Sequence, residues 1–140
     1  MRFMIIVKAT SRSESETRPV PEEALLGEMA RYHAQLTKAG VLLDAAGLKP
    51  SSQGWRIRYA GESRTVVQGP FDEPGNLVAG YTLIQVKSHE EAVEWARRYP
   101  NPAGHDAAAE IEIRPLYELD DFQPSAALAQ VRSLDMRSAS

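Results

Sequence analysis

The sequence predicts a single-domain α+β protein in which two helices cross one mainly antiparallel sheet. Short strand-like apolar segments alternate along the chain with two amphipathic helix patterns. At 140 residues, one core can bury enough surface to be stable without a disulfide or a structural metal. The chain contains no cysteine, which excludes a thiol nucleophile and cysteine-ligated metals.

The first predicted strand spans residues 1–9, which are compact, apolar and rich in strand-forming residues. Both of its faces are apolar, one with Phe3, Ile5 and Val7 and the other with Met4 and Ile6. The strand is therefore expected to be covered on both sides. Residues 10–20 are polar and predict a solvated loop, long enough to act as a flap over a site.

The first helix is expected to begin at Pro21, where proline suits the first turn, and to end near Lys38. Its buried stripe consists of residues spaced by four, three and four positions: Leu25, Met29, Tyr32 and Leu36. Gly40 supplies the left-handed conformation that terminates a helix.

The middle of the chain predicts a short strand and a hairpin. Residues 41–43 start an apolar segment that ends in a turn at Pro50. Residues 55–59 alternate apolar and basic side chains, and residues 64–68 form the returning strand of a hairpin. The Gly69-Pro70 step ends it, and residues 71–76 form an acidic turn.

The second half repeats the strand–helix–strand pattern. Residues 79–87 predict another strand with two apolar faces. Ser88 and Glu91 have capping-box spacing for a helix that ends at Pro100. A strand follows over residues 110–115, and the tail carries a weak amphipathic helix over residues 126–136. We expect a domain over residues 1–122 and a C-terminal helical tail over residues 123–140.

This element order is that of the split βαβ, ferredoxin-like arrangement. Two helices cover only one face of a sheet, yet the strands over residues 3–7 and 81–86 are apolar on both faces. Something must cover the second face, because an exposed apolar face would be a large patch. We expect a homodimer through the sheet faces; the alternative is that the tail folds back over its own sheet.

Charge limits the expected partners. Sixteen basic and nineteen acidic residues give a net charge of −3, so neither nucleic acid nor an anionic membrane is attracted by an overall positive field. The apolar run over residues 4–7 is too short for a signal peptide or a membrane span, which favours a cytoplasmic location. On the hairpin, Arg56 and Arg58 alternate with the aromatic residues instead of sharing their face, unlike a nucleic-acid platform. These arginines could bind a small anion or pair with Glu110 and Glu112.

Several short motifs in sequence order resemble the YCII-related family, and within it the DGPF-domain branch. They occur at residues 38–43, 47–48, 50–52, 69–73, 79–81, 91–92, 95–96 and 110–115. Gly69-Pro70-Phe71 and Glu73 retain the branch's name-giving motif, with Gln68 in place of its aspartate. The resemblance implies a bacterial protein with a dimeric α+β barrel. It also implies one of two roles. The first is small-molecule binding, with or without lyase-like or dehalogenase-like chemistry, and the second is association with sigma factors.

Two residues are candidates for proton transfer, His33 and Glu73, and a third, Asp44, is a candidate for orienting His33. His33 lies at the border of the first helix's apolar stripe, where an imidazole could act as a general base. Glu73 follows a rigid Gly-Pro-Phe turn. Asp44 could orient His33 if the second strand runs back along the helix. The competing interpretations are an ordinary helix histidine, a turn acid and a strand-end aspartate.

The favoured hypothesis is a small-molecule pocket between the first helix and the sheet. Its walls would be Tyr32, His33, Arg56, Phe71 and Glu73, with Asp44 as a further ligand contact. His33 or Glu73 would move a proton, and Arg56 would hold a phenolate or carboxylate. No cofactor is expected, and three histidines without metal-binding spacing give no support for a metal site. The alternative is a non-enzymatic regulatory module that uses the tail as an interaction surface.

Overall fold

The computed structural model describes residues 1–15, 23–105 and 107–138. The strands are β1 (Arg2–Lys8), β2 (Leu42–Gly47), β3 (Trp55–Ala60), β4 (Ser63–Gln68), β5 (Val78–Gln85) and β6 (Ile111–Pro115). The α-helices are α1 (Glu23–Lys38), α2 (His89–Arg97) and α3 (Ala126–Ser138). Single 3₁₀ turns are η1 (Ser51–Gln53), η2 (Pro74–Asn76) and η3 (Leu119–Asp121).

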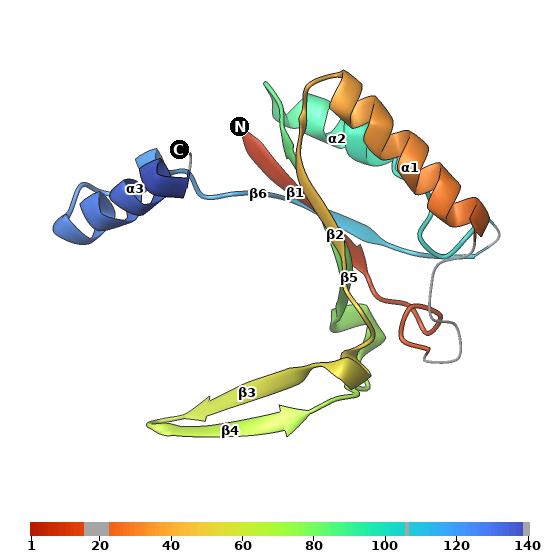
Figure 1. Ribbon diagram of the computed structural model, residues 1–140, viewed down its shortest axis with the longest axis horizontal. Coiled ribbons are helices and arrows are strands. Elements are labelled where there is room, and N and C mark those ends of the chain that lie inside the picture. Colours follow the sequence, from red (N-terminus) through yellow and green to blue (C-terminus); the bar gives the residue numbers. More distant parts are fainter. Residues whose placement is uncertain (16–22, 106, 139–140) are drawn as a thin grey trace.

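Four strands form the main sheet in the order β2-β5-β1-β6, and every neighbouring pair is antiparallel. Helices α1 and α2 lie against one face of this sheet (Figure 1). The predicted α+β, ferredoxin-like fold is therefore confirmed. The hairpin is also confirmed: β3 and β4, which lie between β2 and β5 in the sequence, form a separate two-stranded sheet that does not extend the main one.

The central strand β1 shows how the two faces differ. Phe3, Ile5 and Val7 are buried beneath the helices, whereas Met4 and Ile6 on the other face are only half-buried. Strand β5 follows the same alternation. We call this second side, which neither α1 nor α2 covers, the open face. Both faces are thus apolar, as predicted, and the described part of the chain covers only one of them.

The helices bury part of the stripes that the sequence pattern predicts, and Leu25 and Met29 of the α1 stripe are only half-buried. Tyr32 and Leu36 are buried on α1, and Gly40 has a left-handed φ of 74° just after that helix ends. At the start of α2, the Ser88 hydroxyl accepts a hydrogen bond from the Glu91 amide at 3.1 Å. The Glu91 carboxylate accepts from the amide of Lys87, one residue before the position expected for a capping box. Pro21, the expected start of α1, lies outside the described residues.

The foot of the hairpin is a tight contact between η1 and the residues that follow β4. The Gly69 amide donates to the Gly54 carbonyl at 3.0 Å, and the Phe71 amide donates to the Ser51 hydroxyl at 2.9 Å. Glu14 accepts hydrogen bonds from both the amide and the hydroxyl of Ser51. These contacts tie the N-terminal turn, η1 and the Gly-Pro-Phe segment together, so they fix where the hairpin leaves the sheet.

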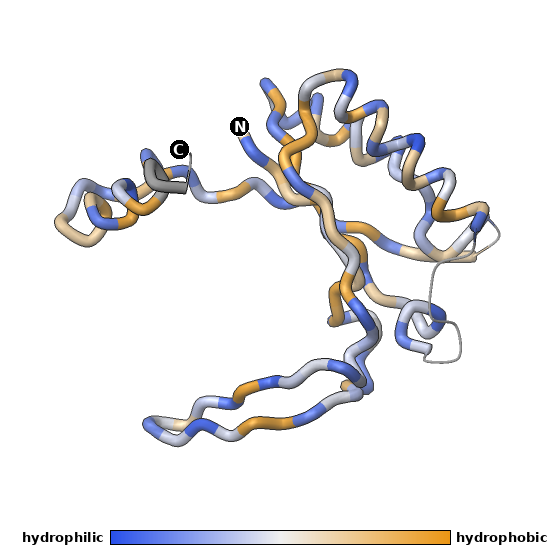
Figure 2. The backbone as a smooth tube through the Cα atoms, in the orientation of Figure 1, coloured by the Kyte–Doolittle hydropathy of each residue, from blue (hydrophilic) through white to orange (hydrophobic). Residues whose placement is uncertain are grey.

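Two arms extend from the main body on the side of the open face. The β3–β4 hairpin leaves from one end of the sheet and α3 from the other, so the chain has the outline of a C (Figure 1). Apolar and polar residues alternate along both arms (Figure 2). Helix α3 stands away from the sheet, which does not fit the alternative in which the tail covers its own open face.

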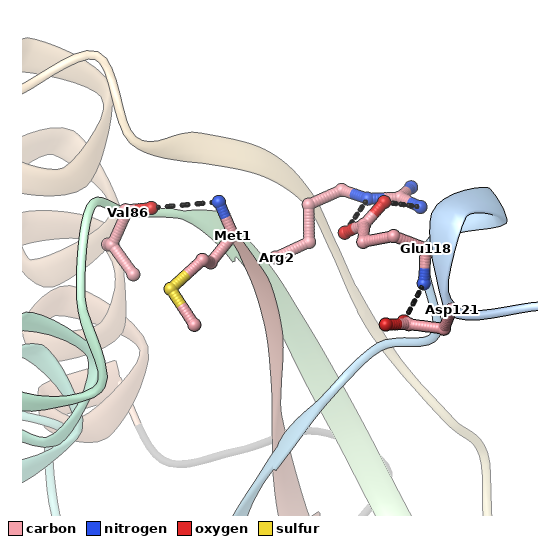
Figure 3. A network of polar contacts seen from close by, with 5 residues as sticks. All are labelled: Met1, Arg2, Val86, Glu118 and Asp121. Carbon is pink, nitrogen blue, oxygen red and sulfur yellow. Dashed lines mark hydrogen bonds and ion pairs between the residues drawn. The ribbon is translucent and has the colours of Figure 1, made fainter.

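The C-terminal arm, residues 117–134, is held at its base by a bidentate ion pair. Arg2 donates to Glu118 through Nε and Nη2, each at 3.0 Å, and the Glu118 amide donates to the Asp121 carboxylate at 2.7 Å (Figure 3). The hydrogen bonds from Arg2 lower the pKa of the Glu118 carboxyl below its ordinary value. The N-terminal amine donates to the Val86 carbonyl at 3.0 Å, which anchors β1 beside this pair.

Candidate functional site

His33 connects α1 to the sheet. Its Nδ1 lies 2.7 Å from the carbonyl oxygen of Met29, and because a carbonyl only accepts, this nitrogen carries a proton. Its Nε2 lies 2.9 Å from the hydroxyl of Thr82, a β5 residue that is completely buried. Both ring nitrogens therefore have protein partners, and His33 satisfies the buried hydroxyl of Thr82.

Aromatic side chains surround this contact. The buried Tyr32 hydroxyl donates to the Trp95 carbonyl at 2.7 Å, and the Tyr32 ring packs edge-on against Tyr99 at 5.0 Å between centroids. Burial raises the pKa of Tyr32. Burial also raises the pKa of Tyr99, opposed by its hydrogen bond with Thr82. Both phenols stay neutral near pH 7, so these groups serve to hold α1 and α2 on the sheet.

A second group of candidates lies at the foot of the hairpin. The Arg56 guanidinium sits over the Phe71 ring at 4.0 Å from its centroid, and Arg56 Nη1 lies 3.6 Å from Glu73 Oε1. Arg56 therefore pairs with Glu73, and not with Glu110 or Glu112 as one interpretation of the sequence expected. Glu112 instead pairs with Lys8 at 3.4 Å and with Arg114 at 3.9 Å on the main sheet.

The predicted pocket between the first helix and the sheet is therefore divided. Tyr32 and His33 belong to the helix–sheet core, whereas Arg56, Phe71 and Glu73 belong to the hairpin foot. Interdigitated aromatic side chains occupy the space beside His33. The structure brings together the second group but does not join it to the first.

Asp44 lies on the open face, and its partner is Tyr81. The Tyr81 hydroxyl donates to Asp44 Oδ2 at 2.9 Å, and this hydrogen bond is the main reason that the pKa of Tyr81 is raised. A register irregularity between Leu42 and Asp44 sets Asp44 opposite Leu83, on the face away from the helices. The sheet therefore separates Asp44 from His33, and the expected His–Asp pair does not form.

The strand register defines the surroundings of this pair. One row across the open face consists of Asp44, Leu83, Met4 and Arg114. The next row consists of Ala46, Tyr81, Ile6 and Glu112. The two central strands thus present an apolar strip that ends in an acid on the β2 edge and in charged residues on the β6 edge.

The sequence pattern did not single out Tyr81 or Thr82 as a polar group with a functional or structural role. Thr82 is the single polar residue among those of β5 that face the helices, and that isolation is a signal for a buried hydrogen-bond partner. Tyr81 is placed by the alternation on the same face as Leu83. Its contact with Asp44 depends on the irregularity in β2, which the sequence pattern does not reveal.

Two hollows lie away from these residues. One, of about 590 Å³, lies between the N-terminal turn, the start of α1 and the loop before β6. At its rim His105 Nε2 lies 2.6 Å from Glu28 Oε1, with His105 largely exposed. The other, of about 480 Å³, lies between η3 and α3. Across the described ranges, no three histidine or acidic side chains gather to hold a metal ion. None of the helices described there is long and apolar enough to span a membrane.

Comparison with known proteins agrees with the fold. Residues 1–118 match the YCII-related domain. An uncharacterised protein of Rhizobium meliloti (strain 1021) is 27% identical over 95 residues, which cover 68% of this chain and 75% of that protein. The matched region runs from β1 to the ion pair at the base of the C-terminal arm and leaves α3 outside.

Proposed function

Because the chain belongs to the YCII-related family, we propose that it acts as a homodimer, joined through the open faces of the two sheets, that binds a small molecule between them. The observation that carries this proposal is the Asp44–Tyr81 hydrogen bond beside the apolar strip of Leu83, Met4 and Ile6 on the open face. A polar pair in such surroundings offers specific contacts to a ligand whose remaining surface is apolar.

The apolar strip supports the dimer. Met4, Ile6 and Leu83 are only half-buried in the single chain, and they occupy the middle of the sheet. A contiguous apolar face of this kind is costly in water, and a two-fold symmetric contact with the same face of a second copy would cover it. Charged residues at both sheet edges would then form the polar rim of the interface.

Replacing Ile6 by lysine is expected to weaken the dimer roughly a hundredfold or more, because two unpaired ammonium groups would be buried at the centre of the interface. Sedimentation velocity over a micromolar concentration range measures the change. The matched control is Leu26→Lys, since Leu26 is 51% exposed on α1, away from the sheet. A native chain that sediments as a monomer throughout this range would contradict the proposed dimer.

The polar pair indicates the class of ligand. The Asp44 carboxylate accepts hydrogen bonds, and Tyr81, kept protonated by that carboxylate, can accept one more on its hydroxyl oxygen. Both groups suit a ligand that donates hydrogen bonds through a hydroxyl or amino group. The neighbouring Leu83, Met4 and Ile6 suit a flat apolar body. We therefore propose a small hydroxylated or amino-substituted ring compound.

A screen of phenols, catechols and aromatic amines by thermal shift is expected to give compounds that stabilise the native dimer. Binding of such a compound should weaken roughly tenfold in Tyr81→Phe, because one hydrogen bond in a desolvated site is lost. Leu26→Ala is the control, since Leu26 is exposed on α1, away from the sheet and from both arms. Equal affinity in both variants, measured by titration calorimetry, would remove Tyr81 from the site.

We assign binding, and not turnover, to this site. His33 and Glu73, the two groups suggested for proton transfer, lie in different clusters, and each already has a protein partner. Assignment to the DGPF branch is a finer proposal, supported by Gly69, Pro70, Phe71 and Glu73. The regulatory alternative has one specific observation in its favour, which is the exposed apolar surface of the C-terminal arm.

A further inference from the structure

We propose that the C-terminal arm of one copy binds the β3–β4 hairpin of the other. The inference rests on the proposed homodimer and names the segments that join its two ends. By the C-terminal arm we mean residues 117–134, and by the hairpin we mean residues 55–68. Both arms extend beyond the main sheet on the side of the open face (Figure 1).

The C-terminal arm exposes apolar side chains that the described part of its own chain does not cover. Tyr117 is 76% exposed and Phe122 47%, with their rings 5.0 Å apart between centroids. On α3, Val131 and Leu134 are also exposed. A helix of 13 residues is marginal in water by itself, so contact with another surface would stabilise it.

The hairpin presents a matching apolar surface. Trp55, Ile57 and Tyr59 alternate along β3 and therefore share one face, which Val66 joins because it pairs with Ile57. All four side chains are more than half exposed. A two-stranded hairpin is seldom stable in water without further packing, so this face too is expected to have a partner.

The charges of the two arms indicate which surface each arm binds. The hairpin carries three arginines and one glutamate, namely Arg56, Arg58, Arg64 and Glu62. The C-terminal arm carries three acids and one arginine, namely Glu118, Asp120, Asp121 and Arg132. Arg56 and Glu118 already have partners within the chain, Glu73 and Arg2, and without them the hairpin keeps a net positive charge and the arm a net negative one. Pairing hairpin with hairpin or arm with arm would bring like net charges together, whereas pairing arm with hairpin brings opposite ones together. Electrostatics therefore favours the mixed contact.

The positions of the arms allow this contact to form twice. The hairpin and α3 lie at opposite ends of the open face (Figure 1). A two-fold rotation that exchanges those ends brings the C-terminal arm of each copy to the hairpin of the other. The two arms, which the described part of their own chain leaves uncovered, would then cover each other in the pair.

The absence of cysteine from the chain makes a disulfide test clean. Full-length Tyr59→Cys and Phe122→Cys variants are mixed in equal amounts, allowed to exchange subunits and oxidised, and covalent dimer is measured on a non-reducing gel. We expect about tenfold more covalent dimer from the mixture than from either variant alone, because only the mixture sets a hairpin cysteine beside an arm cysteine. Val93→Cys, exposed on α2, replaces Tyr59→Cys in the control mixture.

The outcomes separate this inference from the proposed function. If sedimentation shows a dimer but each variant cross-links with itself, or the mixture gives no more product than the Val93→Cys control, the mixed contact is wrong and the homodimer stands. If the native chain and both variants sediment as monomers, the homodimer fails and the arm contact fails with it. Selective cross-linking of the mixture within a sedimenting dimer supports both.

Discussion

Alanine at position 69 is expected to destabilise the foot of the β3–β4 hairpin by about 3 kcal/mol. A Cβ atom at Gly69 would overlap the carbonyl oxygen of Ser51 and lie 2.7 Å from its carbonyl carbon. Both atoms belong to the backbone of η1, so no side-chain rotation can relieve the overlap. The change should therefore disrupt the contact that positions the hairpin, including the hydrogen bond from the Gly69 amide to Gly54.

Hydrogen exchange of the amides in β3 and β4 measures this effect directly, together with urea unfolding of the whole chain. Gly75→Ala is the matched control, because a Cβ atom there meets nothing within 4 Å. We expect the hairpin amides to lose protection in Gly69→Ala and to keep it in Gly75→Ala. Equal protection in the two variants would show that the close approach of Gly69 to Ser51 is not required.

Truncation of Leu36 to alanine is expected to lower the free energy of unfolding by about 2–5 kcal/mol. Leu36 has no exposed surface and packs in the core between α1 and the sheet, so the substitution removes buried apolar atoms and leaves a cavity. The same core holds Tyr32 and its contacts with α2. Loosening it should therefore also weaken the attachment of the helices to the sheet.

The control for this prediction lies on the same helix. Leu26 is 51% exposed on α1, so Leu26→Ala changes the same side chain with little loss of packing. We expect its unfolding free energy to stay within about 0.5 kcal/mol of the native value. Chemical denaturation followed by circular dichroism compares the two variants, and equal destabilisation would contradict the position of Leu36 in the core.

The sequence predicted most elements correctly because their signals are local. The alternation in residues 3–7, the spacing of Tyr32 and Leu36 and the cap at Ser88 each depend on neighbours in the chain, and the structure confirms all three. The hairpin was predicted correctly as a pair of strands, but the pattern did not indicate that it forms a sheet of its own. Whether β3 and β4 join the main sheet depends on the contact of Gly69 with η1, which joins residues distant in sequence.

The candidate site was less predictable than the fold. His33, Asp44 and Glu73 are plausible acids and bases by residue type, but their function depends on which side of the sheet each one occupies. The irregularity in β2 puts Asp44 on the open face beside Tyr81, while His33 contacts Thr82 on the opposite face. A shift of one residue in register exchanges the faces of a strand, and sequence periodicity does not report such shifts.

The sequence by itself determined the order of strands and helices and the fact that two strands are apolar on both faces, since periodicity is a property of consecutive residues. Only the tertiary structure decided that one of these faces is left open, that the hairpin and α3 flank it as separate arms, and that Asp44 and Tyr81 meet on it. These outcomes depend on contacts between residues far apart in the chain. The hydrophobic pattern indicates that a surface must be covered, whereas contacts between distant residues determine which segment covers it.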